Sequence, residues 1–175
     1  MDLGTFWKFI GDARSRARDD RDFLSRTASR LRMLKPEELM EFESHFEKIH
    51  TESFSWNLWG AAYLMNGGCG DDGFDYFRAW LMAQGQQAFD NAVKDPDTLA
   101  TLAEPGTRGS RGFEEFMHLA RETYEEKTGE EMPDSDVLFQ GVVPSEPAER
   151  WDFNDATEMK KRFPKLFAKY GSAYR

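Results

Sequence analysis

The side chains most capable of chemistry in this 175-residue chain lie in one short stretch. The stretch contains Cys69, Asp71, Asp72, Asp75 and Arg78. A cysteine just before a helix start is a candidate nucleophile, because the helix dipole stabilises its thiolate. Closely spaced carboxylates are candidate ligands for a hard cation, and an arginine is a candidate anion ligand. The sequence therefore predicts that any catalytic or binding site lies in this stretch.

Metal binding is one interpretation of the aspartates. Asp71, Asp72 and Asp75, with the amide oxygen of Asn66, could ligate a divalent cation. The loop is too short for an EF-hand and lacks its terminal glutamate. Asp71 or Asp72 has a simpler role as the cap of the helix that follows. The sequence favours capping, and it predicts no cofactor.

Catalysis by Cys69 would require a neighbouring base. The histidines, His45, His50 and His118, fall on predicted amphipathic helices in no recognisable pairing with this cysteine. A thiol that packs in the interior is therefore favoured over a reactive one.

Ligand binding at the glycine-rich loop is a further interpretation. The loop glycines could present backbone N–H groups to an anion, as happens at many helix starts. The loop lacks the Gly-Lys-Ser/Thr ending of a nucleotide-binding P-loop and follows a helix instead of a strand. The candidate ligand-binding residues are Asn66, Asp71, Asp72, Arg78 and Trp56.

Asp75 and Arg78 are the charged residues of a segment, 74–82, that is otherwise almost entirely apolar. A helix of this kind is normally buried, and residues three apart lie on the same helix face. We therefore expect a buried ion pair. It either fixes the helix in place or holds Arg78 as an anion ligand with Asp75 as its orienting partner, and the sequence leaves both roles open.

The segments that position these residues predict an all-α fold, an irregular helical bundle around a central helix-loop-helix. Val and Ile are scarce, whereas Phe is abundant with 15 residues, which argues against an extended sheet. Apolar spacing and capping residues predict helices over 6–17 (capped by Thr5), 20–34, 36–49, 55–65, 71–84, 86–93 and 113–127, and a single turn near Leu99, capped by Asp97.

The chain length fits one domain over residues 1–175. Residues 130–153 contain three prolines and little helical period, so we expect an extended connection there. A C-terminal helix over 154–171 would close over the bundle, with a break or kink near Phe163 because Pro164 cannot continue a helix.

Composition restricts the partners. A net charge of −9 disfavours nucleic acids and anionic membranes, both of which require a cationic surface. A single cysteine fits a reducing compartment, and no segment has the length of apolar sequence that spans a membrane. We therefore expect a cytoplasmic protein whose partner is another protein or a small molecule. The oligomeric state is not predicted.

Three groups of residues resemble a bacterial family of domains of unknown function. They are the central run 56–81 (W-N-L-W-G-A-A-Y, N-G-G-C-G-D-D and F-D-Y-F-R-A-W-L), the opening Asp2 to Trp7, and the closing Arg162 to Leu166. Most family members have serine where this chain has Gly70, so a hydroxyl-dependent role of the loop is not expected. The resemblance implies a small helical domain, sometimes found near or fused to regulators, with no catalytic residues to transfer.

These observations favour a non-catalytic binding or regulatory module. The alternative is an enzyme, or a metal- or anion-binding protein, with its site at the loop and helix from Asn66 to Arg78. A pocket that opens onto Asp71, Asp72 and Arg78, with a ligand, an ion or a carboxylate of strongly shifted pKa, would favour the alternative. An Asp75–Arg78 pair that is buried, mutually bonded and far from any cavity would exclude the enzyme.

Overall fold

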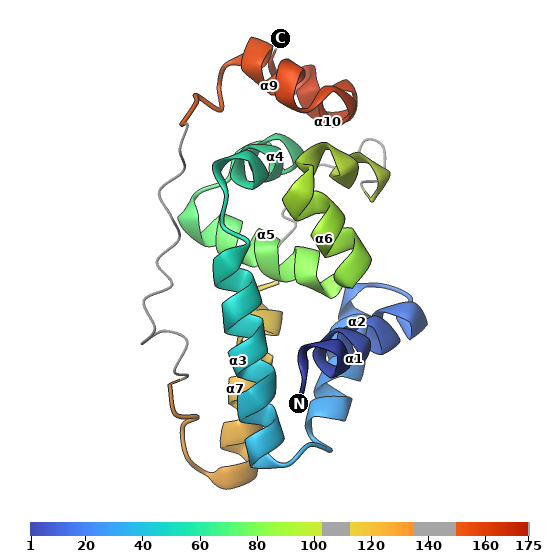
Figure 1. The fold of residues 1–175 in the computed structure, drawn as a ribbon, viewed down its shortest axis with the longest axis vertical. Helices are drawn as coiled ribbons and strands as arrows, with labels where there is room; N and C mark the ends of the chain where they lie inside the picture. Colours follow the sequence, from blue (N-terminus) through green and yellow to red (C-terminus); the bar gives the residue numbers. More distant parts are fainter. Residues whose placement is uncertain (103–112, 135–149, 175) are drawn as a thin grey trace.

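The computed structural model describes residues 1–102, 113–134 and 150–174, and these ranges contain helices and no strands. This confirms the predicted all-α fold (Figure 1). The α-helices are α1 Leu3–Arg16, α2 Asp20–Leu31, α3 Pro36–Glu52, α4 Trp56–Asn66, α5 Asp71–Ala83, α6 Gln86–Lys94, α7 Glu114–Thr128, α9 Ala156–Arg162 and α10 Pro164–Tyr170. Two short 3-10 helices are η1 Pro96–Thr101 and η2 Gly171–Tyr174. None of the helices in these ranges is long and apolar enough to cross a membrane.

Two long helices, α3 and α7, lie side by side and pack against each other (Figure 1). Helix α5 contacts both of them, α1 and α2 lie beside them, and α4, α6 and α10 lie towards one end (Figure 1). Bulky aromatic rings fill the interior, as the composition predicts. Among the fully buried side chains are Phe6, Phe23, Phe42, Phe74, Phe77, Phe116, Phe163 and Tyr170.

Several helix ends follow the predicted capping chemistry. The Ser55 hydroxyl accepts a hydrogen bond from the Leu58 amide and begins α4, and Gly67, in the left-handed region at φ 73°, ends it. Three predicted ends were wrong, one of which is the end of α3, which continues past residue 49 to Glu52. Asp2 caps α1 by accepting from the amide of Thr5, which itself lies inside the helix, and α2 ends at Leu31.

The corner between α4 and α5 differs from the prediction in its cap. Gly70 is the N-cap of α5 and no side chain caps it, while Asp71 and Asp72 lie exposed in the first turn. They act there through the helix dipole. The indole Nε1 of Trp59 donates to the Cys69 carbonyl at 2.9 Å and so fixes the loop against α4.

The predicted C-terminal helix consists of two helices that meet at Phe163, as expected from Pro164. The start of α10 is capped from elsewhere in the chain. The buried carboxylate of Asp97 accepts from the amides of Lys165 and Leu166 at 3.0 and 2.9 Å, so its predicted role as the cap of the η1 turn was wrong. The η1 turn is capped by Asp95, which accepts from the Asp97 amide at 3.1 Å.

The connection predicted over residues 130–153 falls largely outside the described residues. Its first part, 130–134, and its last part, 150–153, contain no helix. Trp151 in the last part lies directly over α4, where a Cβ added to Gly60 would come within 2.6 Å of the indole ring. Glycine at this position lets α4 and Trp151 pack in close contact.

Candidate functional site

Arg78 and Asp75 form the predicted ion pair, but only Arg78 is buried, and the end of α3 provides a further acceptor for it. The Arg78 Nη2 bonds the Asp75 carboxylate, while Nη1 donates to the His50 carbonyl at 2.6 Å. In return, the His50 Nε2 lies 2.9 Å from the Asp75 carbonyl. Because a carbonyl can only accept, this ring nitrogen must carry the proton. These contacts tie the last turn of α3 to the first turns of α5.

The two partners differ in exposure. The Arg78 side chain is 6% exposed, whereas the Asp75 side chain is 43% exposed. The guanidinium lies over the rings of Phe74 and Phe54, at 4.9 and 5.6 Å from their centroids, and its buried Nε has no hydrogen-bond acceptor. Cation–π attraction offsets part of the cost of that unpaired group.

A second buried charge cluster lies further along α3. Arg121 on α7 bonds Glu43 through Nε at 2.8 Å and Glu47 through Nη2 at 2.7 Å. The Glu43 side chain is 5% exposed. Arg121 also reaches the carbonyl of Met132, at 3.4 Å, so this cluster joins α3, α7 and the chain after α7.

A cleft of about 460 Å³ joins the two clusters. Helix α3 contributes Glu43, Glu47 and His50, and α5 contributes Asp75 and Arg78. Helix α7 supplies Arg121 and His118. A volume of this size lies within the range of small-molecule sites, roughly 300–1,000 Å³. The cleft has charged groups of both signs, and among the ion-paired residues that line it Asp75 is the most exposed.

Burial perturbs two groups in this cleft. Desolvation raises the pKa of Glu43 from 4.5 to about 7, because it outweighs the attraction of Arg121. Desolvation lowers the pKa of His50 from 6.5 to about 4, and the charge of Arg78 acts in the same direction. At neutral pH, therefore, His50 is uncharged, and the pKa of Glu43 lies well above the usual range of a carboxylate.

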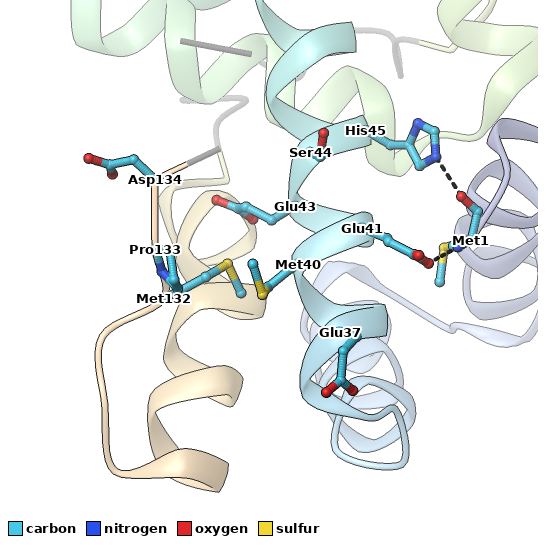
Figure 2. A pocket seen from close by; sticks show the side chains of 10 residues that line it. All are labelled: Met1, Glu37, Met40, Glu41, Glu43, Ser44, His45, Met132, Pro133 and Asp134. Carbon is cyan, nitrogen blue, oxygen red and sulfur yellow. Dashed lines mark hydrogen bonds and ion pairs between the residues drawn. The ribbon is translucent and has the colours of Figure 1, made fainter. Parts of the chain in front are cut away.

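Two further cavities adjoin this region. One, of about 420 Å³, is lined by Phe54, Trp56, Trp59, Phe74, Asp71, Asp75 and Arg150. The other, of about 490 Å³, lies on the far side of Glu43 (Figure 2). There the side chains of Met40 and Met132 face each other across the cavity, and Met1 bonds Glu41 and His45. Glu43 lines both this cavity and the charged cleft.

The sequence-predicted residues are only partly brought together. Asp75 and Arg78 line the charged cleft, whereas Trp56 and Asp71 line the aromatic cavity with Asp75. Asp72 lines neither cavity. Within the described ranges no group of three or more acidic, histidine or cysteine side chains could hold a metal ion. The aspartate set considered as a metal site, Asp71, Asp72 and Asp75, therefore does not converge.

Cys69 is half-buried and lies beside Asn66. Desolvation raises the pKa of its thiol to about 11, although a hydrogen bond with the Asn66 side chain acts in the opposite direction. At neutral pH the thiol is protonated, so it lacks the thiolate that a nucleophile requires. The raised pKa is opposite to the shift expected from the helix dipole, and the thiol is half-buried, not fully packed in the interior.

Sequence reasoning missed Glu43, Glu47, Arg121 and the role of His50. One signal was present, because Glu43 falls within the apolar stripe of α3, between Phe42 and Phe46. A carboxylate in a buried stripe requires a partner. The sequence did not indicate that the partner would be Arg121, 78 positions away.

A search of curated proteins and a search of solved structures each found no match. A family model described as a protein of unknown function, DUF4240, matches residues 1–126. The match includes both charge clusters and the central run 56–81, and it ends before Arg162 to Leu166. The chain therefore belongs to the DUF4240 family of proteins of unknown function.

Proposed function

We propose that this chain is a bacterial, cytoplasmic binding module without catalytic activity, and that it recognises a basic segment of a partner protein at the charged cleft between α3, α5 and α7. The observation that carries the proposal is the arrangement of charge in the cleft. Arg78 and Arg121 are already bonded to carboxylates, while Asp75 remains 43% exposed. A basic side chain is the group that best complements such a surface.

The overall charge of −9 supports this choice, because it favours association with cations and disfavours anions. The states of the candidate catalytic groups support binding over chemistry. Cys69 is a protonated thiol, and His50 is neutral with one ring nitrogen bonded to a carbonyl. A protonated thiol is a poor nucleophile, and the lowered pKa of His50, about 4, makes it a weak base.

Affinity enrichment from host cells with quantitative mass spectrometry tests the proposal. Immobilised wild-type protein is compared with Glu47→Gln, which removes a cleft carboxylate, and with Asp72→Asn, which removes an exposed charge outside the cleft. A specific partner is retained by wild type and Asp72→Asn and is weakened about two- to fivefold by Glu47→Gln. Equal retention on all three proteins would contradict a role for the cleft.

A small-molecule site is the second candidate, favoured by the cleft volume of about 460 Å³. In this case the polar groups would orient a metabolite, as in an enzyme or a ligand sensor. A thermal-shift screen with metabolites tests it, because a ligand at a hundred times its Kd stabilises the folded state by about 2.7 kcal/mol. A hit that Glu47→Gln abolishes and Asp72→Asn retains would favour this candidate over the protein partner.

A further inference from the structure

The aromatic cavity beside the α4–α5 corner has a composition that differs from the charged cleft. Phe54, Trp56, Trp59 and Phe74 provide its walls, and Asp71 and Asp75 provide carboxylates. Phe54, Trp56 and Trp59 are half-buried, so parts of their rings remain accessible. The cavity volume of about 420 Å³ is sufficient for a small organic group.

The walls of this cavity are held in fixed orientations. Trp59 and Phe74 stack with centroids 5.0 Å apart and an interplanar angle of 8°. Trp56 and Phe54 each meet Trp59 edge to face, at 5.4 and 5.9 Å. The indole nitrogens of Trp56 and Trp59 donate to the carbonyls of Trp151 and Cys69. A ligand would therefore meet an aromatic surface that needs little reorganisation.

The same rings already contact two cations of the chain. Arg78 lies over Phe74 and Phe54 from the buried side, and the exposed Arg150 lies 5.3 Å from the Trp56 ring centroid. Aromatic faces attract cations through the ring quadrupole, most strongly when the cation is weakly hydrated. Arg150 thus shows that the outer side of this aromatic surface accepts a positive charge.

We propose that the aromatic cavity binds an organic cation of the quaternary ammonium type, with Asp71 and Asp75 balancing its charge and Arg150 competing for the Trp56 face. A methylated ammonium group has no strong N–H donor, so it gains more from aromatic rings than from ion pairing. An unmodified lysine ammonium is strongly hydrated and gains less. The chemistry is shared by a free metabolite and by a methylated side chain of another protein. The inference is independent of the proposed function, because the charged cleft and this cavity share only Asp75 among their lining residues.

Isothermal titration calorimetry at constant chloride concentration tests the proposal with two matched pairs of probes. The first pair is choline and 3,3-dimethyl-1-butanol, in which a neutral carbon replaces the quaternary nitrogen. The second pair is a peptide that contains trimethyllysine and the same peptide with unmodified lysine. We expect at least one cationic probe to bind in preference to its control, and the tighter of the two identifies the source.

Variants outside the charged cleft locate the binding. Asp71→Asn should weaken binding about two- to fivefold, whereas Asp72→Asn, an exposed neighbour that does not line the cavity, should leave it unchanged. Phe54→Leu keeps an apolar side chain but removes a ring, and should weaken binding about two- to fivefold. Arg150→Ala should tighten it by removing the competitor, and melting temperatures establish that each variant is folded.

Three results would overturn the proposal. One is equal binding of each cationic probe and its control. Another is no binding of any probe to either wild type or Arg150→Ala. The third is an equal loss with Asp71→Asn and Asp72→Asn, which would reflect general surface charge. Glu47 lines the charged cleft but not this cavity, so Glu47→Gln should leave binding of the cationic probes unchanged. A failure of this proposal can therefore be told apart from a failure of the proposed function.

Discussion

Glu43 and His50 should make opposite contributions to the pH dependence of stability, and single substitutions should reveal each one. The folded protein raises the pKa of Glu43 from 4.5 to about 7 and lowers that of His50 from 6.5 to about 4. Both side chains are largely buried, so solvent screening reduces these effects little. Glu43→Gln and His50→Gln are the matched changes, because glutamine retains hydrogen-bonding groups but does not titrate.

The sign follows from the number of protons bound in each state. Between pH 4.5 and 7 the folded protein keeps the Glu43 proton that the unfolded chain has lost, so this contribution to stability falls as pH rises. Between pH 4 and 6.5 the unfolded chain binds a His50 proton that the folded protein lacks, so this contribution grows as pH rises. Each slope is about 1.4 kcal/mol per pH unit.

From pH 4.5 to 6.5 the two slopes nearly cancel in the wild type. As pH rises over this range, the free energy of unfolding of Glu43→Gln should therefore increase by about 2 kcal/mol, and that of His50→Gln should decrease by a similar amount. The double variant lacks both titrating groups. Its free energy of unfolding should therefore depend on pH about as weakly as that of the wild type, in which the two contributions cancel. Urea denaturation followed by circular dichroism at several pH values measures these free energies. The protein concentration is kept low because the pI of about 4.9 lies within this pH range, where a protein without net charge tends to associate.

Glu122→Gln, at an exposed position of α7, is the control for changes in net charge. Carboxylates whose pKa is lowered, such as Asp22 and Glu158, are unchanged in every variant, so their contributions cancel in the comparison with wild type. If Glu43→Gln and His50→Gln have the same pH slope as wild type, the buried charges of the cleft are solvated and the reasoning is wrong. The reasoning is also wrong if both single variants change the pH slope of the free energy of unfolding in the same direction.

Two further predictions concern the packing around α4. Cys69 should react with iodoacetamide at pH 8 about tenfold more slowly than an ordinary thiol. Desolvation raises its pKa from 9.0 to about 11, and the smaller thiolate fraction outweighs the higher nucleophilicity of that thiolate. Equal alkylation rates in the native protein and in urea would contradict this shift. Gly60→Ala should destabilise the fold by about 1–3 kcal/mol, because the new Cβ meets the Trp151 ring at 2.6 Å. Its control is Gly11→Ala, where the new Cβ meets no neighbouring side chain within 4 Å. The higher helix propensity of alanine should stabilise the fold of this variant by up to about 1 kcal/mol. Equal urea midpoints for the two glycine variants would contradict the close contact at Gly60.

The helices could be predicted because their signals are local. Apolar spacing predicted α3 and α7, Ser55 and Gly67 predicted both ends of α4, and Pro164 predicted the break between α9 and α10. The spacing of Asp75 and Arg78 also predicted their contact, since residues three apart on a helix share a face. Local chemistry was least reliable at helix starts, where several polar residues compete for one cap.

The site could not be predicted to the same extent, because its contacts are distant in the sequence. The Arg78–His50 bond spans 28 positions, and the Arg121–Glu43 bond spans 78. No spacing rule joins residues so far apart. Asp97 is a further case, since its place in the sequence suggested a local cap but tertiary packing directs it to the start of α10.

The two members of the Asp75–Arg78 pair can have different roles, one structural and one functional, because their surroundings differ. Arg78 is 6% exposed and bonds groups on α3 and α5, a role that it fills without any ligand. Asp75 is 43% exposed and lines both the charged cleft and the aromatic cavity. Replacing Arg78 would leave a carboxylate and a buried carbonyl without their donor, and would damage the fold. Replacing Asp75 would alter both cavities at once, so neither substitution can assign a function. Glu47 and Asp71, which each line one cavity, are the positions that separate the two sites.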